Sequence, residues 1–401
     1  MTVVSFPIRF EDANLVASAP GRIDFLNTHQ DYKGLPVVPV AINLRTYIAI
    51  LEPRENFVFE SLNLKEEGKP YRDEFEPAYP DQKEKGWCGN YLRAVVTAVE
   101  DYLGRPFEEG FHAVIYSEVP IGSGLASSAA LEVALAKALD AYFNLHIPRA
   151  ELAEICFRAE NIYMEIPCGR LDQYSSTFGG AILLYPRPPV RVEELPLKNV
   201  DFVVVDSGIR HSVADIHPRR QGEINEGLRQ LMESADVPQA LKEKLGYSFD
   251  EPLWEEIEYP ELQPYLGMIS ETAAKRITFT VLMNKLTMDA VSLIKSGAPD
   301  LPQRLGEIVN KQHELLRDLY EVSLPELEKI RDAMLDAGAY GVKISGAGMG
   351  GSLVAVTPSE EEVKRRIVKA AIKAGARKGW SVKVDEGARV DYRREGLRYN
   401  L

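Results

Sequence analysis

Hydrophobic and polar positions alternate along the first part of the chain in a way that predicts both strands and helices. Residues 15–52 hold Val- and Ile-rich runs interrupted by Gly and Pro, which predicts strands. Residues 53–86 are polar and punctuated by Pro, which predicts a surface excursion. Apolar residues at spacings of three and four predict a helix over 91–103. The run 111–120 predicts a further strand.

Two helices are predicted next, one that starts near Ser127 and one over residues 149–164. Buried-strand runs follow at 179–186 and 200–208. The Pro-containing linker between those runs, near 186–200, predicts a domain boundary. The first helix starts near Ser127 and places four apolar side chains on one face: Leu131, Leu135, Leu139 and Tyr142.

The second half of the chain is mostly helical in pattern to about residue 336. A Gly-rich loop then separates strand-like segments within 341–356, and 360–375 has the pattern of an amphipathic helix. Helices and strands interleave without strict βαβ alternation, which indicates an α+β fold. We therefore predict two domains, one over residues 1–195 and one over residues 196–401.

Composition narrows the class of protein. The chain has 401 residues, 45% of them hydrophobic and 27% charged, which suits a globular protein of two domains. The formal net charge of −13 disfavours nucleic acid as a partner, because phosphate backbones require clustered Lys and Arg. A phosphorylated small molecule remains compatible, since it needs only a local electropositive pocket.

The sequence indicates a cytoplasmic protein without a membrane partner. The start lacks the basic region and apolar run of a signal peptide. No apolar stretch approaches the roughly 20 residues that a transmembrane helix needs. The three cysteines, Cys88, Cys156 and Cys168, fit neither a CxxC metal pattern nor a disulfide framework.

The stretch "PIGSGLASSAALEVALAKAL", residues 120–139, is a candidate phosphate site. Its glycines let backbone N–H groups approach an anion, and the following helix directs its positive end to the same place. The alternative is an ordinary turn followed by a helix capped by serine. The motifs of the common nucleotide and dinucleotide folds are absent, which argues against a dinucleotide-dependent oxidoreductase.

Two further segments point to a cleft between the domains. "SGAGMGG", residues 345–351, is a second Gly-rich loop with glycines at Gly346, Gly348 and Gly350. Taken alone it would fit a tight strand connection. "APGRIDFLNTHQDYKG", residues 19–34, concentrates charged and polar side chains that would also fit a solvated loop. Together with the stretch 120–139 they indicate anion-binding backbone beside hydrogen-bonding side chains.

These segments resemble, in order and spacing, the three motifs of the GHMP small-molecule kinases. "HQDYKG" at 29–34 resembles the galactokinase signature HTDYNGG, and "AENIYMEIPCGRLDQ" at 159–173 resembles the family's AEHxFxGxPCGxMDQ. The resemblance to the galactokinase branch covers most of the chain. It implies a two-domain α+β fold with the active site in the interdomain cleft. It also implies phosphorylation of a sugar's anomeric hydroxyl with ATP and Mg²⁺.

The resemblance implies a role for each matching residue. Asp172 matches the aspartate proposed to take the hydroxyl proton, with orientation of the hydroxyl alone as the alternative, and Arg22 matches the arginine that pairs with it. Ser128 and Glu160 match the Mg²⁺ positions, although Ser127 is an alternative to Ser128. The phosphate loop of the family matches Gly122, Ser123, Gly124, Leu125, Ala126, Ser127 and Ser128, and Trp87 lies near the expected adenine pocket. The sugar site matches Thr28, His29, Asp31 and Gly169. The third motif matches Gly346, Gly348 and Gly350.

The sequence departs from the galactokinase pattern around the sugar. Thr28 replaces the glutamate that usually accepts a hydrogen bond from the C6 hydroxyl. The segment after "RHSVAD", residues 210–215, is also shorter than in galactokinases, and we expect His217 in place of the family tyrosine that contacts the sugar. Galactose is the first choice of substrate. A C6-altered sugar such as galacturonate is the second, because a neutral Thr28 would not repel a carboxylate.

A galactokinase-like sugar sensor without catalysis is the alternative from another class of protein. Such a sensor would be expected to lose catalytic residues or the phosphate loop. This sequence keeps Arg22, Asp172, Glu160 and the loop, which favours an enzyme. The expected partners are a sugar and ATP, and the expected state is a monomer or homodimer.

Overall fold

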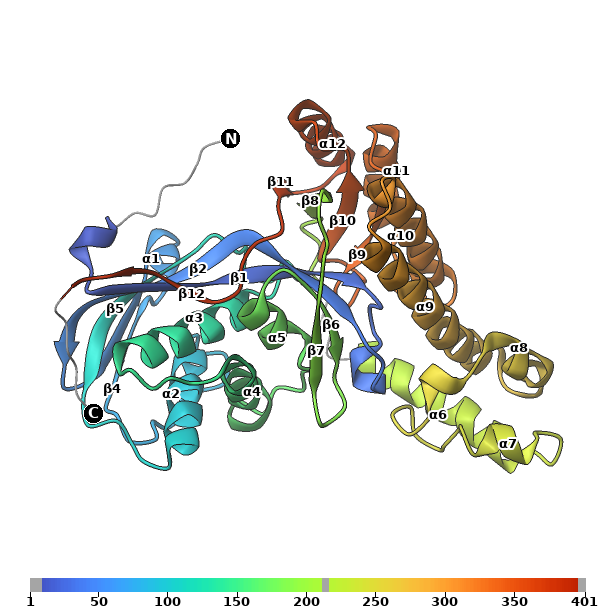
Figure 1. Ribbon diagram of the computed structural model, residues 1–401, viewed down its shortest axis with the longest axis horizontal. Helices are drawn as coiled ribbons and strands as arrows, with labels where there is room; N and C mark the ends of the chain where they lie inside the picture. The colour runs from blue at the N-terminus through green and yellow to red at the C-terminus, as the bar shows by residue number, and fades with distance from the viewer. Residues whose placement is uncertain (1–8, 211–215, 396–401) are drawn as a thin grey trace.

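The computed structural model describes residues 9–210 and 216–395, and Figure 1 shows their arrangement. Within these residues the larger sheet has eight strands in the order β12-β1-β2-β5-β3-β4, with β6 joined to β2 and β7 joined to β6. Neighbours are antiparallel except β3 with β5. The strands are β1 (Leu15–Leu26), β2 (Val38–Arg54), β3 (Phe57–Ser61), β4 (Arg72–Phe75), β5 (Gly110–Ser117), β6 (Ala181–Tyr185), β7 (Arg191–Leu195) and β12 (Arg389–Arg393).

Helices cover one face of this sheet (Figure 1). Apolar side chains of α2 and α3, such as Val95 and Leu135, share a buried core with Phe57 and Phe111 of the sheet. This burial explains the helical spacing of apolar residues in the sequence. We call the sheet with these helices the N-terminal lobe. Its helices are α1 (Leu62–Glu66), α2 (Asn90–Leu103), α3 (Ser127–Tyr142), α4 (Arg149–Arg158) and α5 (Leu171–Phe178).

A second, four-stranded antiparallel sheet has the order β11-β8-β10-β9. Its central strands β8 and β10 are almost wholly buried because helices cover them. We call this sheet and its helices the C-terminal lobe. It comprises β8 (Asp201–Asp206), α9 (Glu271–Ser296), α10 (Leu301–Asp318), α11 (Pro325–Asp336), β9 (Gly341–Ser345), β10 (Ser352–Thr357), α12 (Glu361–Ala374) and β11 (Lys378–Val382). The predicted α+β fold is confirmed.

A helical arm, residues 216–270, extends from the C-terminal lobe (Figure 1). It contains α6 (Ile216–Glu233), α7 (Gln239–Lys242) and α8 (Tyr259–Leu262), which pack around the buried Trp254. Helix α9 alone is long and apolar enough, by length and composition, to cross a membrane in the part of the chain that the structure describes. It buries Phe279 and Met283 in the lobe's core, so its apolar composition is that of a core helix.

The predicted division at 195/196 separates the strands of the two sheets, with one exception. Strand β12 pairs with β1, so the chain returns to the N-terminal lobe after building the C-terminal lobe. The sequence pattern gave no sign of this return. The division itself stays a prediction, and β12 belongs by its hydrogen bonds to the first sheet.

A buried arginine, Arg45, binds residues 385–387, the segment just before β12, to the N-terminal lobe. The Arg45 guanidinium on β2 donates to Asp385 Oδ2 at 2.8 Å and to the carbonyl oxygens of Glu386 and Gly387 at 2.9 and 2.8 Å. It also donates to Ser18 Oγ on β1 at 2.8 Å. Since a buried arginine needs partners for its N–H groups, this set of acceptors fixes the path of the segment.

Replacing this arginine should destabilise the protein strongly. We expect Arg45→Leu to lower the free energy of unfolding by about 3 kcal/mol, because Asp385 and two carbonyl groups lose their donor. Arg54→Leu is the matched control, since Arg54 pairs with Glu52 on the surface, where such pairs contribute about 0–1 kcal/mol. Urea denaturation measures both, and equal losses would contradict the proposed fastening.

Candidate active site

The phosphate-loop segment turns sharply before α3. Gly122 and Gly124 have φ angles of 69° and 79°, and Ala126 also lies in the left-handed region at 58°. Ala126 is the residue that precedes the first turn of α3, and it makes no side-chain cap. The alternative of a serine-capped helix is therefore wrong. The first N–H groups of α3 lack a side-chain cap and suit an anion.

The second Gly-rich loop packs directly on the first. Ser352 Oγ donates to the carbonyl oxygen of Ser123 at 2.5 Å, and Asp24 N donates to Ser345 Oγ at 3.0 Å. Gly348 and Gly350 have φ angles of 84° and 140°. A Cβ at these two positions would lie 2.6 Å from Val322 O and 2.7 Å from Ile209 O, respectively. Glycine is therefore required here by both conformation and space.

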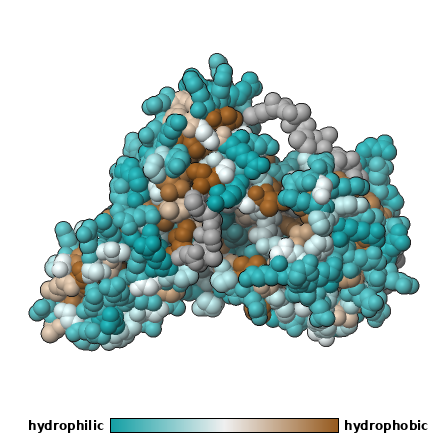
Figure 2. Space-filling view, turned by 180° about the vertical axis from the view of Figure 1, so that it is seen from behind, coloured by the Kyte–Doolittle hydropathy of each residue, from teal (hydrophilic) through white to brown (hydrophobic). Residues whose placement is uncertain are grey.

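Gly346 completes the contact between the two loops. It has a φ angle of 91°, and a Cβ built on it would lie 3.8 Å from the carbonyl oxygen of Gly124. All three predicted glycines of the third motif thus lie in the loop that faces the phosphate loop. The two loops come from opposite lobes, so the predicted site lies where the lobes meet. From behind, the surface is hollowed between the lobes (Figure 2).

Arg22 and Asp172 form an ion pair beside the phosphate loop. The Nε and Nη2 atoms of Arg22 lie 2.8 and 2.7 Å from Asp172 Oδ1. Arg22 Nη1 donates to the carbonyl oxygen of Gly124 at 2.6 Å. Arg22 is buried on β1, while the Asp172 side chain, in the first turn of α5, is 32% exposed. One guanidinium therefore connects the sheet, the phosphate loop and an acid that solvent can reach.

Glu160 lies in an unusual turn close to Ser128. Helix α4 passes into a π-helical turn over Ala159–Tyr163, a type of irregularity that is frequent at functional sites. The Ser128 hydroxyl donates to Glu160 Oε1 at 3.5 Å. Burial, together with the nearby charge of Asp172, raises the pKa of Glu160 to about 7. A cation at this place would offset that burial.

The segment 19–34, which we call the sugar motif, brings Asp31 close enough to Asp172 for the Asp172 charge to affect the Asp31 pKa. His29 Nε2 lies 3.0 Å from the carbonyl oxygen of Ala347, in the third-motif loop. Burial lowers the pKa of His29 well below its usual range, so the ring is neutral. Gly169 lies so close to Asp31 that a Cβ on Gly169 would collide with the Asp31 carboxylate. Burial and the charge of Asp24 raise the pKa of Asp31 to about 6.

Thr28 is hydrogen-bonded to a lysine of the C-terminal lobe. Its hydroxyl accepts a hydrogen bond from Lys343 Nζ at 2.7 Å, and Lys343 also donates to the carbonyl oxygen of Asp24 at 2.9 Å. Both side chains are buried. Burial lowers the pKa of Lys343 to about 8. Lys343 comes from β9, so the C-terminal lobe supplies a cation to the sugar motif of the N-terminal lobe.

Sequence reasoning missed Lys343 and Arg210 as site residues. Arg210 is held by Asp206 through two contacts of 2.8 Å, and its Nε would lie 3.6 Å from a Cβ on Gly122. The only signal for these two residues was their position next to matching motifs. His217, noted as a departure in the sequence, lies beside His29, with the two ring centroids 5.2 Å apart.

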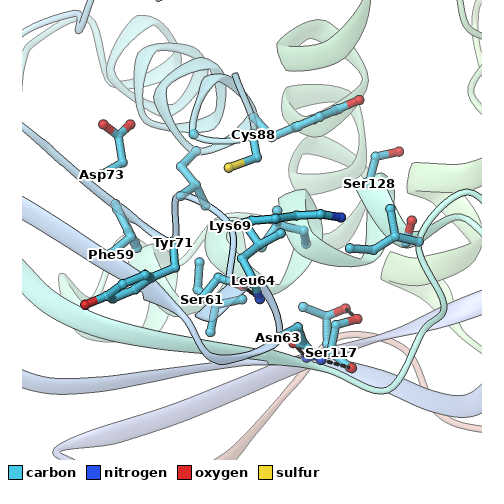
Figure 3. A pocket seen from close by; sticks show the side chains of 18 of the residues that line it. Phe59, Ser61, Asn63, Leu64, Lys69, Tyr71, Asp73, Cys88, Ser117 and Ser128 are labelled. Atoms are coloured by element: carbon cyan, nitrogen blue, oxygen red, sulfur yellow. Dashed lines mark hydrogen bonds between the residues drawn. The ribbon is translucent and has the colours of Figure 1, made fainter. Parts of the chain in front are cut away.

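A pocket of about 490 Å³ opens beside the phosphate loop. Figure 3 shows Ser128 on the opposite side of this pocket from Phe59 and Tyr71. Asn63 is fixed on its floor by two hydrogen bonds with the backbone of Ser117, at 2.9 and 2.8 Å. Four residues predicted to bind ATP are among those that line it: Trp87, Gly122, Ser127 and Ser128.

Known families match three parts of the chain. The model described as "GHMP kinases N terminal domain" matches residues 90–180, and the model described as "GHMP kinases C terminal" matches residues 298–376. The model described as "Galactokinase galactose-binding signature" matches residues 5–51. These segments hold the phosphate loop, the third motif and the sugar motif described above.

Whole-chain relatives agree with these matches. A galactokinase from Thermotoga maritima is 32% identical over 347 residues, which cover 84% of this chain and 88% of the relative. This chain belongs to the galactokinase family of GHMP kinases. A Homo sapiens galactokinase is 31% identical over 354 residues, covering 86% of this chain and 83% of the relative.

Solved structures show the same fold. The galactokinase of Lactococcus lactis complexed with galactose superposes with a TM-score of 0.75 at 26% identity, and 94% of each chain is covered. The mevalonate kinase of Methanococcus jannaschii has a TM-score of 0.68 at 19% identity, covers 93% of this chain and 99% of its own, and supports the fold alone. This member of the galactokinase family is therefore an ATP-dependent sugar kinase, as the resemblance implied.

The raised pKa of Asp31 can be measured directly. We expect one aspartate carboxyl to titrate near pH 6 instead of near the ordinary 3.8, because burial and Asp24 disfavour its charge. NMR of protein labelled with ¹³C at the aspartate carboxyl measures this, and Asp31→Asn should remove that one signal. The expectation fails if all aspartate carboxyls titrate below about pH 5.

Proposed function

We propose that this galactokinase-family member transfers the γ-phosphoryl group of ATP to the anomeric hydroxyl of a galactose-type hexose, with galactose as the first choice. The observation that carries the proposal is the Arg22 guanidinium, which contacts Asp172 at 2.7 Å and Gly124 O at 2.6 Å. It places an acid suited to a sugar hydroxyl beside backbone suited to a phosphate. The names of the relatives support the same reaction.

Asp172 and Arg22 are proposed to act on the reacting hydroxyl. The hydroxyl proton passes to Asp172 as the sugar oxygen bonds to phosphorus and the bond from phosphorus to ADP breaks. Arg22 holds the Asp172 carboxylate in place and offers positive charge to the transferring group. Phosphoryl transfer depends mainly on such positioning and charge stabilisation. The helix N-terminus of α3 and the loop N–H groups are proposed to bind the phosphates.

The residues present fit a magnesium ion shared with the nucleotide. Ser128 and Glu160 offer oxygen ligands 3.5 Å apart, and buried Glu160 has a raised pKa that a cation would relieve. Among the described residues no group of three or more His, Cys, Asp or Glu side chains forms a cage. Mg²⁺ commonly takes one or two protein ligands plus phosphate oxygens. When bound, it neutralises charge on the phosphates.

The remaining predicted residues are proposed to select the two substrates. Trp87 lines the pocket that would take the adenine, at a distance from the sugar motif. His29, Asp31 and Gly169 are proposed to contact sugar hydroxyls, with Thr28 near C6. The enzyme is proposed to act in the cytoplasm as a monomer or homodimer, without nucleic acid or membrane. The sensor alternative is disfavoured because the chain keeps Arg22 and Asp172, the proposed catalytic residues, in contact with each other.

A C6-carboxylated sugar such as galacturonate is the second candidate. The observation in its favour is buried Lys343, which donates to Thr28 Oγ1 where relatives of this branch are expected to have glutamate. Among the described residues the Lys343 ammonium contacts the Thr28 hydroxyl and the Asp24 carbonyl oxygen rather than a carboxylate. A substrate carboxylate near Thr28 would therefore meet a buried cation whose charge the nearby Asp24 offsets in part.

Asp172→Asn should abolish most of the turnover. The amide keeps the shape of the side chain but accepts a proton poorly, so we expect kcat to fall by about 10²–10⁴. ATP binding, measured by isothermal titration, should change little, because the phosphate loop is intact. ADP release with sugar present gives kcat. Near-wild-type turnover would show that Asp172 does not take the proton.

A sugar panel distinguishes the two substrate candidates. Galactose, galacturonate, N-acetylgalactosamine and fucose are compared by kcat/KM for formation of the sugar 1-phosphate, and galactose is expected to be used best. Thr28→Glu should lower kcat/KM for galacturonate at least about tenfold relative to galactose, because it adds a repelling charge. Turnover of galacturonate far above galactose by the wild-type enzyme would overturn the first choice.

A further inference from the structure

A chain of buried polar side chains lies behind the proposed metal ligand. Gln173, which is fully buried on α5, donates from Nε2 to Glu160 Oε2 at 2.7 Å and to Glu132 Oε2 at 3.1 Å. Glu132 is also fully buried, one turn after Ser128 on α3. A single amide group therefore bridges two carboxylates that belong to different elements. The catalytic steps proposed above use neither Gln173 nor Glu132.

The orientation of this amide is dictated by its neighbours. The amide nitrogen of Gln173 faces both acids, and each hydrogen of its NH₂ group has one carboxyl oxygen as acceptor. Burial and the charge of Glu160 raise the pKa of Glu132 well above its ordinary value, but a protonated Glu132 still accepts this hydrogen bond at Oε2. Glu132 thus holds the amide of Gln173 in the orientation that serves Glu160.

The amide in turn decides which oxygen of Glu160 is free. Oε2 is occupied by Gln173, and Oε1 faces the Ser128 hydroxyl at 3.5 Å. Without the amide, the Glu160 carboxylate would lose its shortest hydrogen bond and could rotate within the π-helical turn. Partners behind a metal ligand commonly set its orientation and affinity in this way.

We infer that Gln173 is a positioning residue that orients Glu160 toward a divalent cation, and that Glu132 anchors Gln173 for this purpose. The inference rests on the proposed metal site. Gln173 directly follows Asp172 on α5, so one helical turn would position both the proton acceptor and the metal ligand. A shift of α5 would therefore disturb both groups together.

The test is the affinity of Mn²⁺, used in place of Mg²⁺, for the protein with ADP bound. Electron paramagnetic resonance measures free Mn²⁺ directly, without turnover. Gln173→Met keeps the volume but removes the donor, and we expect Mn²⁺ to bind about 10–100-fold more weakly. Binding of galactose without metal, measured by isothermal titration, should stay within about twofold of wild type.

Gln312→Met is the matched control. Gln312 is likewise fully buried, and its amide donates to Thr287 Oγ1 at 2.9 Å between α10 and α9. The Gln312→Met variant removes a comparable buried amide that lies away from the site, so Mn²⁺ affinity should not change. If Gln312→Met weakens Mn²⁺ binding as much as Gln173→Met, the effect is general destabilisation and the inference is overturned.

A second pair of variants keeps the inference testable if Gln173→Met does not fold. Glu132→Gln retains an oxygen that accepts from Gln173 and should bind Mn²⁺ within about threefold of wild type. Glu132→Ala removes the anchor and should lose about tenfold. Unchanged Mn²⁺ affinity in Glu132→Ala, or in a folded Gln173→Met, would overturn this inference alone. A wild-type protein that binds no Mn²⁺ with ADP would overturn the proposed metal site as well.

Discussion

The contact between two glycine-rich loops, one from each lobe, decides where the proposed site residues lie. Backbone meets backbone here because side chains are absent at Gly346 and Gly124. A hydrogen bond from Ser352 to the carbonyl oxygen of Ser123 joins the two loops, and one from Asp24 N to Ser345 Oγ joins β1 to the second loop. Both glycines have positive φ angles, of 91° and 79°, which other residues rarely adopt, so a substitution at either position would strain the loop that makes this contact.

Around this contact the molecule accumulates buried charge. Arg22 and Lys343 bring cations into the interior, and Asp31 and Glu160 bring acids whose pKa values are raised by burial. Keeping such groups out of water is unfavourable unless ligands or partners compensate. A sugar and a nucleotide with its metal would supply those partners. The site is thus built to be stabilised by what it binds, as in other enzymes with perturbed acids.

Local motifs made much of this arrangement predictable from sequence. Arg22, Asp172 and the glycines stand in short segments that resemble family motifs, and the fold brings Arg22 into contact with both Asp172 and Gly124. Contacts between residues far apart in the sequence have no comparable local motif that would predict them. Nothing in the sequence around Lys343 indicates that it reaches Thr28, and nothing around β12 indicates a partner in β1. Ala126 before α3 and the π-helical turn at Glu160 likewise depend on tertiary packing more than on local preference.

The pairing of β12 with β1 also bears on how the protein is made. Strand β1 carries Arg22 and ends at Leu26, whereas β12 begins at Arg389. A ribosome releases the first strand long before the second, so the edge of the first sheet stays open while the other lobe is synthesised. Unpaired strand edges attract other chains. The β1 edge of the nascent chain therefore lacks its native partner until residues 389–393 emerge.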